Sequence, residues 1–149
     1  MKVIYADYWG SYISVVAASI HLGILEEYDE EKIRSIKGFG ENNFSKLGEL
    51  IFFAEDQKSR RIYILGVKKS GRIAERALNG ISKIFGLGKN DVDFVDLYIY
   101  ENVFTKMGGF LSQKLCFKSA GEKLVLIGIK RNFNKLKNLV HKMKEKPLK

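Results

Sequence analysis

The stretch Tyr8–Leu25 carries no charged side chain, and it directly follows a segment rich in β-forming residues, Lys2–Asp7 (KVIYAD). A membrane span needs about 20 mostly apolar residues. This run is at the short end for a span, and it is interrupted by Gly10 and several serines. It therefore predicts a buried strand end, a loop and a helix, Ser14–Leu22, packed hard against a sheet.

The rest of the chain alternates between strand-like and helix-like patterns. Further strands are predicted at Glu49–Ala54, Arg61–Val67, Asp93–Tyr100 and Lys123–Ile129. Helices are predicted from an Asp29 cap through Ile36, from about Arg72 to Ile84, and at Asn102–Cys116 and Asn132–Lys144. The polar turn Glu55–Arg60 between two strands favours an antiparallel hairpin.

This alternation predicts an α/β fold of one domain, residues 1–146, with a frayed tail at 147–149. We expect a three-layer sandwich with a mostly parallel, five-stranded sheet and one antiparallel hairpin strand.

The charged side chains are unevenly distributed. The formal net charge is +9; acidic and basic residues balance within residues 1–110, and the excess lies within 111–149. One interpretation is contact with a polyanion such as a nucleic acid through the Lys-rich last helix. The other is a solvated face, since charge runs are usually exposed. The lysines concerned are Lys135, Lys137, Lys142 and Lys144.

Cysteine and histidine usage limits the chemistry. Cys116 is the single cysteine, which excludes an intrachain disulfide and fits a cytoplasmic protein; its apolar neighbours favour a buried thiol. His21 is expected to be a hydrogen-bonded structural histidine, and with only His141 besides, we predict no metal site. We expect no membrane contact, and the sequence leaves the cofactor and the oligomeric state open.

Ligands of open α/β sheets bind beyond the carboxyl ends of the strands. That rule selects the loops Asp7–Ile13, Gly66–Arg72, Tyr98–Asn102 and Gly128–Asn132. In the first loop, a helix begins with unpaired N–H groups and a partial positive charge. Gly10 permits close backbone approach, and Ser11 and Ser14 offer hydroxyls. These features predict an anion or phosphate site; the alternative is a plain strand-to-helix turn with serine as its cap.

Side chains around this loop add to the candidate site. Trp9 and Tyr12 would stack on a ring or cover the sheet edge, and Lys69, Ser70 and Arg72 in the second loop would assist with charge or form a solvated turn. Asp7 is the weak candidate for a catalytic base or magnesium contact; it could equally cap the loop backbone.

The stretch KVIYADYWGSYISVVAASIHLGIL resembles a family of short, uncharacterised bacterial proteins, found mainly in Firmicutes and described as a domain of unknown function. The likeness continues through GELIFFAED, RIYILGV, SGRIAERALNGI, GGFLSQKLC and LVLIGI, and so covers nearly the whole chain. The resemblance implies an α/β fold and points to the same first loop, but it implies no activity.

Members of that family typically have a Tyr-Gly-Gly loop followed by Ser or Thr, a His and another Ser. The matching residues here are Tyr8, Gly10, Ser11, Ser14, His21 and Gly23. Trp9 replaces a common Gly, Tyr12 stands where a His is usual, and Ala6 and Asp7 stand where a His-Cys pair is common. If those His and Cys residues carry chemistry in relatives, the resemblance implies that this chain has lost it.

Two functions follow from the sequence. The first is binding of a phosphate-bearing small molecule or nucleotide at the first strand-loop-helix turn. The alternative is a polyanion-binding or adaptor domain that uses the Lys-rich C-terminal helix. Whether any reaction is catalysed does not follow from the residues.

Overall fold

The computed structural model describes residues 1–41, 44–88 and 91–147. Its sheet contains four strands, in the order β2-β3-β1-β4. The central strand β1 runs parallel to β3 and β4, and β2 and β3 form the expected antiparallel hairpin. The α/β class is therefore confirmed, but the prediction of five strands is wrong. The strands are β1 (Lys2–Asp7), β2 (Ile51–Glu55), β3 (Arg61–Gly66) and β4 (Val92–Asp96).

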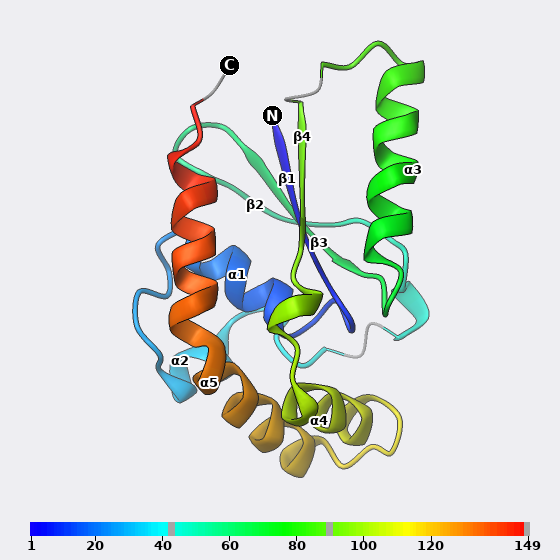
Figure 1. The fold of residues 1–149 in the computed structure, drawn as a ribbon. Coiled ribbons are helices and arrows are strands. Elements are labelled where there is room, and N and C mark those ends of the chain that lie inside the picture. Colours follow the sequence, from blue (N-terminus) through cyan, green and yellow to red (C-terminus); the bar gives the residue numbers. More distant parts are fainter. Residues whose placement is uncertain (42–43, 89–90, 148–149) are drawn as a thin grey trace.

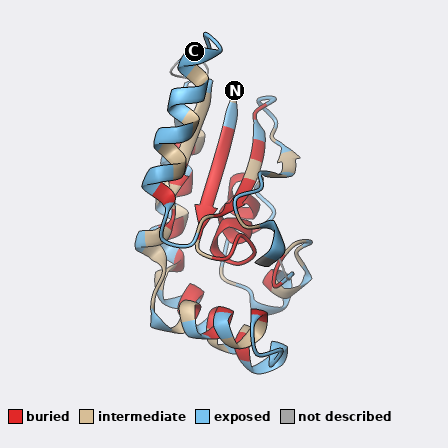
Figure 2. Cartoon of the chain, turned by 90° about the vertical axis from the view of Figure 1, so that its right-hand side faces the viewer, coloured by how far each residue is buried: buried red, intermediate tan, exposed pale blue. Residues whose placement is uncertain are grey.

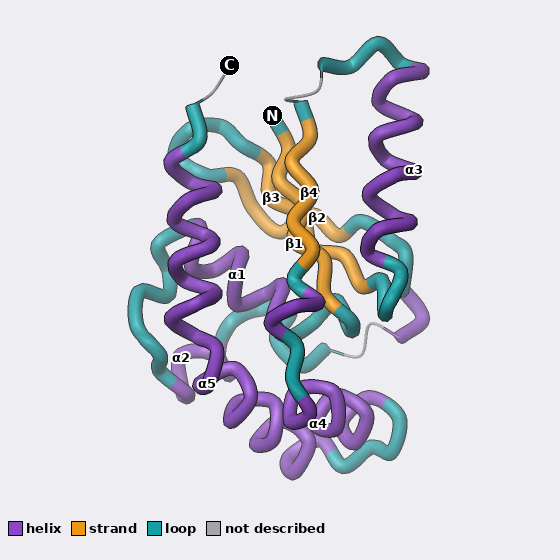
Figure 3. The backbone as a smooth tube through the Cα atoms, viewed as in Figure 1, coloured by secondary structure: helices purple, strands orange, loops and turns teal. Residues whose placement is uncertain are grey.

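Helices flank both faces of the sheet (Figures 1 and 3). One face packs on α1 and α5 through the larger apolar core, whereas α3 lies against the other face. Every residue of α1 is buried, as expected for the uncharged run, and β1 is buried after its first residue (Figure 2). The helices are α1 (Ile13–His21), α2 (Glu30–Ser35), α3 (Gly71–Ile84), α4 (Val103–Gln113) and α5 (Lys118–Glu145).

The predicted fifth strand, Lys123–Ile129, lies inside α5, which also includes the predicted last helix, Asn132–Lys144. This part of α5 packs on α4 and on α1, so it is buried on more than one side and apolar nearly all round. A short apolar run of that kind does not distinguish a buried strand from a buried helix. The loop expected at Gly128–Asn132 is consequently helical.

Helix α4 and the first part of α5 form a hairpin beyond the carboxyl ends of the parallel strands, and the rest of α5 runs back alongside the sheet (Figure 1). Glycines let the two backbones approach closely: a Cβ added to Gly108 would lie 2.7 Å from the Val125 amide nitrogen. The small residues of α4 face inward, and the bulky Val103, Met107 and Phe110 are exposed. Cys116, in the turn between the helices, is also exposed, so the expectation of a buried thiol is wrong.

Helix α5 ends at Glu145, and the domain end at residue 146 stays a prediction. Residues 148 and 149 of the expected tail lie outside the described part of the chain. Within the described residues, no helix is both long and apolar enough to cross a membrane.

Candidate functional site

One amide in the first turn of α1 and one in the loop before it are occupied by a side chain of the protein itself. One carboxylate oxygen of Asp7 accepts a hydrogen bond from the Ser14 amide at 2.8 Å, and the other accepts one from the Gly10 amide. Asp7 comes from the end of β1 and is completely buried. It therefore takes the place that an external anion would need, and it does what the alternative prediction expected, which is to cap the loop backbone.

The neighbouring polar side chains of the first loop also point inward. Ser11 and Tyr12 are buried, and the side-chain amide of Gln113 on α4 lies 3.4 Å from the Ser11 hydroxyl and 3.3 Å from the Tyr12 hydroxyl. The same amide donates to the Glu41 carbonyl at 2.8 Å. These contacts hold α4 against the first loop, so the two side chains contribute to packing.

Glu101 is a second acid at this edge of the sheet, and it is partly buried. Its carboxylate accepts hydrogen bonds from the Tyr8 amide at 3.2 Å and from the Thr105 hydroxyl at 2.8 Å. Burial, followed by the nearby charge of Asp7, raises the pKa of Glu101 to about 7. Burial also raises the pKa of Asp7, although the Ser14 and Gly10 amides oppose that rise. A carboxyl of this kind can take up or release a proton at neutral pH.

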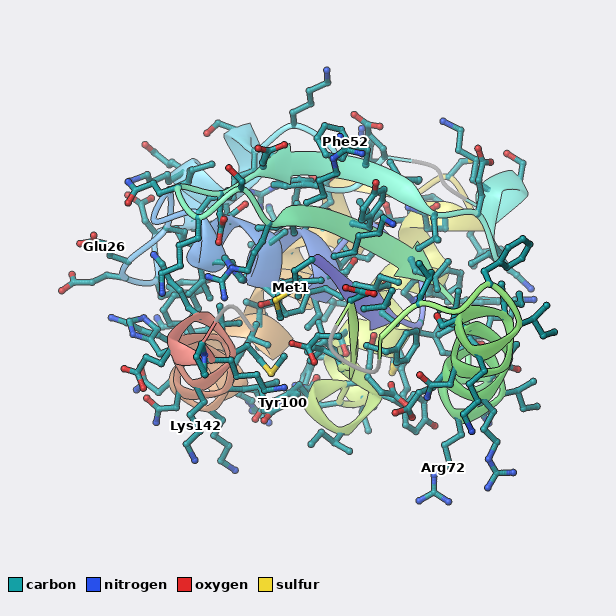
Figure 4. The ribbon with its side chains drawn as sticks, turned by 90° about the horizontal axis from the view of Figure 1, so that it is seen from above. Met1, Glu26, Phe52, Arg72, Tyr100 and Lys142 are labelled. Carbon is teal, nitrogen blue, oxygen red and sulfur yellow. The ribbon has the colours of Figure 1, made fainter. Side chains whose placement is uncertain are left out.

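The second loop, Gly66–Arg72, has only part of the arrangement that the sequence predicted for it. Ser70 is the N-cap residue of α3 but makes no side-chain capping hydrogen bond. The carboxylate of Asp96, at the end of β4, lies where a Cβ of Gly71 would be. Arg72 is exposed and extends into solvent (Figure 4), so it does not join the first loop.

A basic pocket of about 330 Å³ lies between the first loop, the second loop and α4. We call it the lysine pocket. Among the residues that the structure describes, its lining includes no acidic side chain. It brings Trp9 and Lys69, two of the predicted site residues, together with Lys106 of α4 and Lys114 directly after α4, which sequence reasoning missed. The lining residues are Tyr8, Trp9, Lys68, Lys69, Lys106, Phe110 and Lys114.

Packing explains why this pocket is formed. The Trp9 indole lies directly on Gly109 of α4, where any Cβ would overlap the ring. Trp9 also packs on Tyr8, with ring centroids 4.8 Å apart. Lys106, one turn before Phe110, lies 4.4 Å above the centre of the Tyr98 ring, and its ammonium donates to the Tyr98 hydroxyl at 3.2 Å. The absence of a side chain at Gly109 therefore brings Lys106 of α4 close to the strand ends.

A comparison with known proteins identifies the family of this chain. Residues 2–145 match a family described as a protein of unknown function, DUF3189. The chain belongs to the DUF3189 family. No curated protein and no solved structure matches it.

This DUF3189 protein has a second polar cluster at the opposite edge of the sheet. The His21 ring, as expected, is hydrogen-bonded: its Nδ1 lies 2.8 Å from the Tyr5 hydroxyl and its Nε2 lies 3.1 Å from an Asp56 oxygen. The same oxygen accepts from Nε of the fully buried Arg60 at 2.6 Å, and Arg60 Nη1 donates to the Met143 carbonyl at 3.3 Å. This cluster ties β1, α1, the hairpin and the end of α5 together.

Two electrostatic effects stabilise that cluster. Burial lowers the pKa of His21, which favours the neutral ring. Burial alone would raise the pKa of Asp56, but hydrogen bonds from Arg60 and His21 lower it to about 2. The sequence assigned Asp56 and Arg60 to an ordinary polar turn, because nothing in their spacing indicates a buried ion pair. Within the described residues, no group of three or more His, Cys, Asp or Glu side chains is placed to hold a metal ion.

The four lysines of the polyanion hypothesis do not share one surface. Lys135 and Lys142 line a groove of about 470 Å³ with Tyr100, and Lys142 and Tyr100 lie on the same side of the molecule (Figure 4). Lys144 instead lines a small pocket beside His21, and Lys137 lines neither of these two cavities.

Proposed function

We propose that this DUF3189 protein binds a phosphate-bearing small molecule, such as a nucleotide or a sugar phosphate, in the lysine pocket. One observation carries the proposal: lysines from two distant segments, Lys68–Lys69 and Lys106–Lys114, line one pocket at the carboxyl edge of a parallel sheet. Several ammonium groups gathered at one pocket create a positive potential that attracts a dianionic phosphate.

The aromatic side chains of the pocket suggest what else the ligand carries. Tyr8 and Phe110 line the pocket beside the lysines, and flat aromatic rings favour stacking with a base or a sugar face. A volume of about 330 Å³ is near the lower end of the range for small-molecule sites. A mononucleotide or a sugar phosphate suits this size better than a larger cofactor.

The proposal retains only part of the predicted site. Trp9 and Lys69 stay in it, whereas the Ser14 amide of α1 and the Gly10 amide of the loop donate to Asp7. Ser70 and Arg72 are absent from the pocket lining, although they belong to the same loop. Glu101 lies beside Tyr8, so a bound phosphate would have a titratable carboxyl nearby.

Isothermal titration calorimetry tests the proposal with inorganic phosphate, ribose 5-phosphate and nucleoside mono-, di- and triphosphates. We expect Lys69→Ala and Lys106→Ala each to weaken binding about tenfold, the usual effect of losing one charge-assisted contact. Lys123→Ala removes an exposed lysine that lines none of the described pockets and serves as the control. Equal effects of all three variants, or no binding of any phosphate compound, would refute the proposal.

A second candidate function is polyanion binding in the groove of Lys135 and Lys142. Its specific support is the combination of two lysines, two asparagines and Tyr100 along one open groove. Binding of single-stranded RNA or DNA should then fall steeply with salt. Lys135→Ala and Lys142→Ala should weaken it, whereas the matched Lys137→Ala should not; equal losses at all three positions would indicate only a diffuse charge effect.

A further inference from the structure

A larger cavity, about 520 Å³, lies along the edge strand β2 and is separate from both sites above. We call it the β2 groove. Helix α1 packs on β1 and β3. The neighbouring strand β2 instead faces α2 and the turn that follows α2. The wall of the groove is largely apolar and includes the buried Ile64 of the core. Its main apolar residues are Leu22, Ile36, Ile51, Phe53 and Ile64.

Positive charge borders this apolar wall. Lys32 of α2, Lys37 of the following turn and Lys46 all line the groove, and all three are exposed. Glu41 is the single acidic residue of the lining within the described part of the chain. Lys32 and Lys37 come from α2 and the turn directly after it, whereas Lys46 comes from a later segment, so the fold brings two stretches of the chain to one groove.

We propose that the β2 groove binds an amphipathic anion, a molecule with an apolar chain or ring system and one carboxylate or sulfonate head group. Two features together point to this class. A cavity of this volume suits a small molecule, and its apolar wall favours a chain or ring that loses water on binding. The excess of lysine over glutamate is complementary to a single negative head group. The inference uses none of the residues of the lysine pocket.

Fluorescence titration of the whole protein with anilinonaphthalene sulfonate, followed by displacement with octanoate, decanoate and decanol, tests the proposal. Decanoate should bind about tenfold more tightly than octanoate, because each buried CH₂ contributes about 0.8 kcal/mol. Decanol should bind at least about fivefold more weakly than decanoate, because it lacks the charge that pairs with the lysines. Absence of a chain-length effect, or equal binding of decanol, would overturn the inference.

Three variants locate the binding. Ala54→Trp places a bulky ring in the groove and should weaken decanoate and decanol alike by about tenfold. Lys37→Glu should weaken decanoate about fivefold and leave decanol unchanged. Lys123→Glu, on α5 and away from the groove, should change neither; circular dichroism checks that each variant is folded.

Two other outcomes count against the proposal. If Lys37→Glu and Lys123→Glu weaken decanoate equally, the attraction is a general effect of net charge. If no acyl chain binds but an acidic, apolar peptide shifts the NMR signals of β2, the free strand edge pairs with an extended chain, and the assignment to small amphipathic anions is wrong. Failure of either kind leaves the lysine pocket untested, so the two proposals are judged independently.

Discussion

Replacing Glu101 by glutamine should stabilise the protein at alkaline pH and have much less effect at acidic pH. The Glu101 carboxyl is held beside Asp7 in a largely buried position, which raises its pKa from 4.5 to about 7. Above pH 7 the folded protein must therefore carry a charge that it disfavours, whereas the unfolded chain carries the same charge in water. A carboxyl whose pKa is raised by folding thus lowers stability as pH rises through that interval.

The magnitude follows from the two pKa values. One pH unit corresponds to about 1.4 kcal/mol, so ionised Glu101 costs the folded state about 3 kcal/mol at pH 8 and about 1 kcal/mol at pH 5. Glutamine removes this cost and keeps both hydrogen bonds: its oxygen accepts from the Tyr8 amide, and its amide donates to the Thr105 hydroxyl. The gain of the variant over wild type should therefore grow by about 2 kcal/mol between pH 5 and pH 8.

Urea unfolding at pH 5, 6, 7 and 8 measures this difference. Glu26→Gln is the matched control, because the Glu26 side chain projects into solvent (Figure 4), and its effect should not change over the same range. The reasoning is wrong if the advantage of Glu101→Gln is constant with pH, or if it shrinks as pH rises. Either result would mean that Glu101 is well solvated or stably paired with a cation.

Three further substitutions test packing and the buried ion pair. Gly109→Ala should destabilise the protein by about 3 kcal/mol, because the new methyl group overlaps the Trp9 indole. Gly80→Ala, in open space on α3, should instead stabilise the protein by about 0.5–1 kcal/mol. Thermal unfolding of both variants measures these changes in stability. Asp56→Asn should cost about 3 kcal/mol at pH 7 because it leaves Arg60 buried and unpaired. Since folding lowers the pKa of Asp56 to about 2, that cost should shrink as pH falls from about 4 to 2, and a cost independent of pH would contradict the ion-pair account.

Burial and local structure could be predicted in the segments where the local sequence pattern and the tertiary packing favour the same conformation. The part of the uncharged run that forms α1 is buried throughout, and the Asp29 cap, the hairpin and the strand β1 all lie where expected. In these segments hydrophobic pattern, capping residue and turn chemistry agree. The segment Lys123–Ile129 was assigned to a strand because its local pattern is ambiguous: only contact with α4 and α1 decides that it is helical.

Part of the candidate site could likewise be predicted from the sequence, and part of it could not. The amino-acid sequence by itself determined that polar and basic residues stand at the ends of β1 and β3, because strand ends and glycines can be recognised from local pattern. Only the tertiary structure decided that Asp7 occupies an amide of α1, that Glu101 lies beside it, and that Lys106 and Lys114 complete a pocket with Lys69. The physical reason is that charge and hydrogen bonding act over a few ångströms in space, between residues that can be a hundred positions apart in the chain.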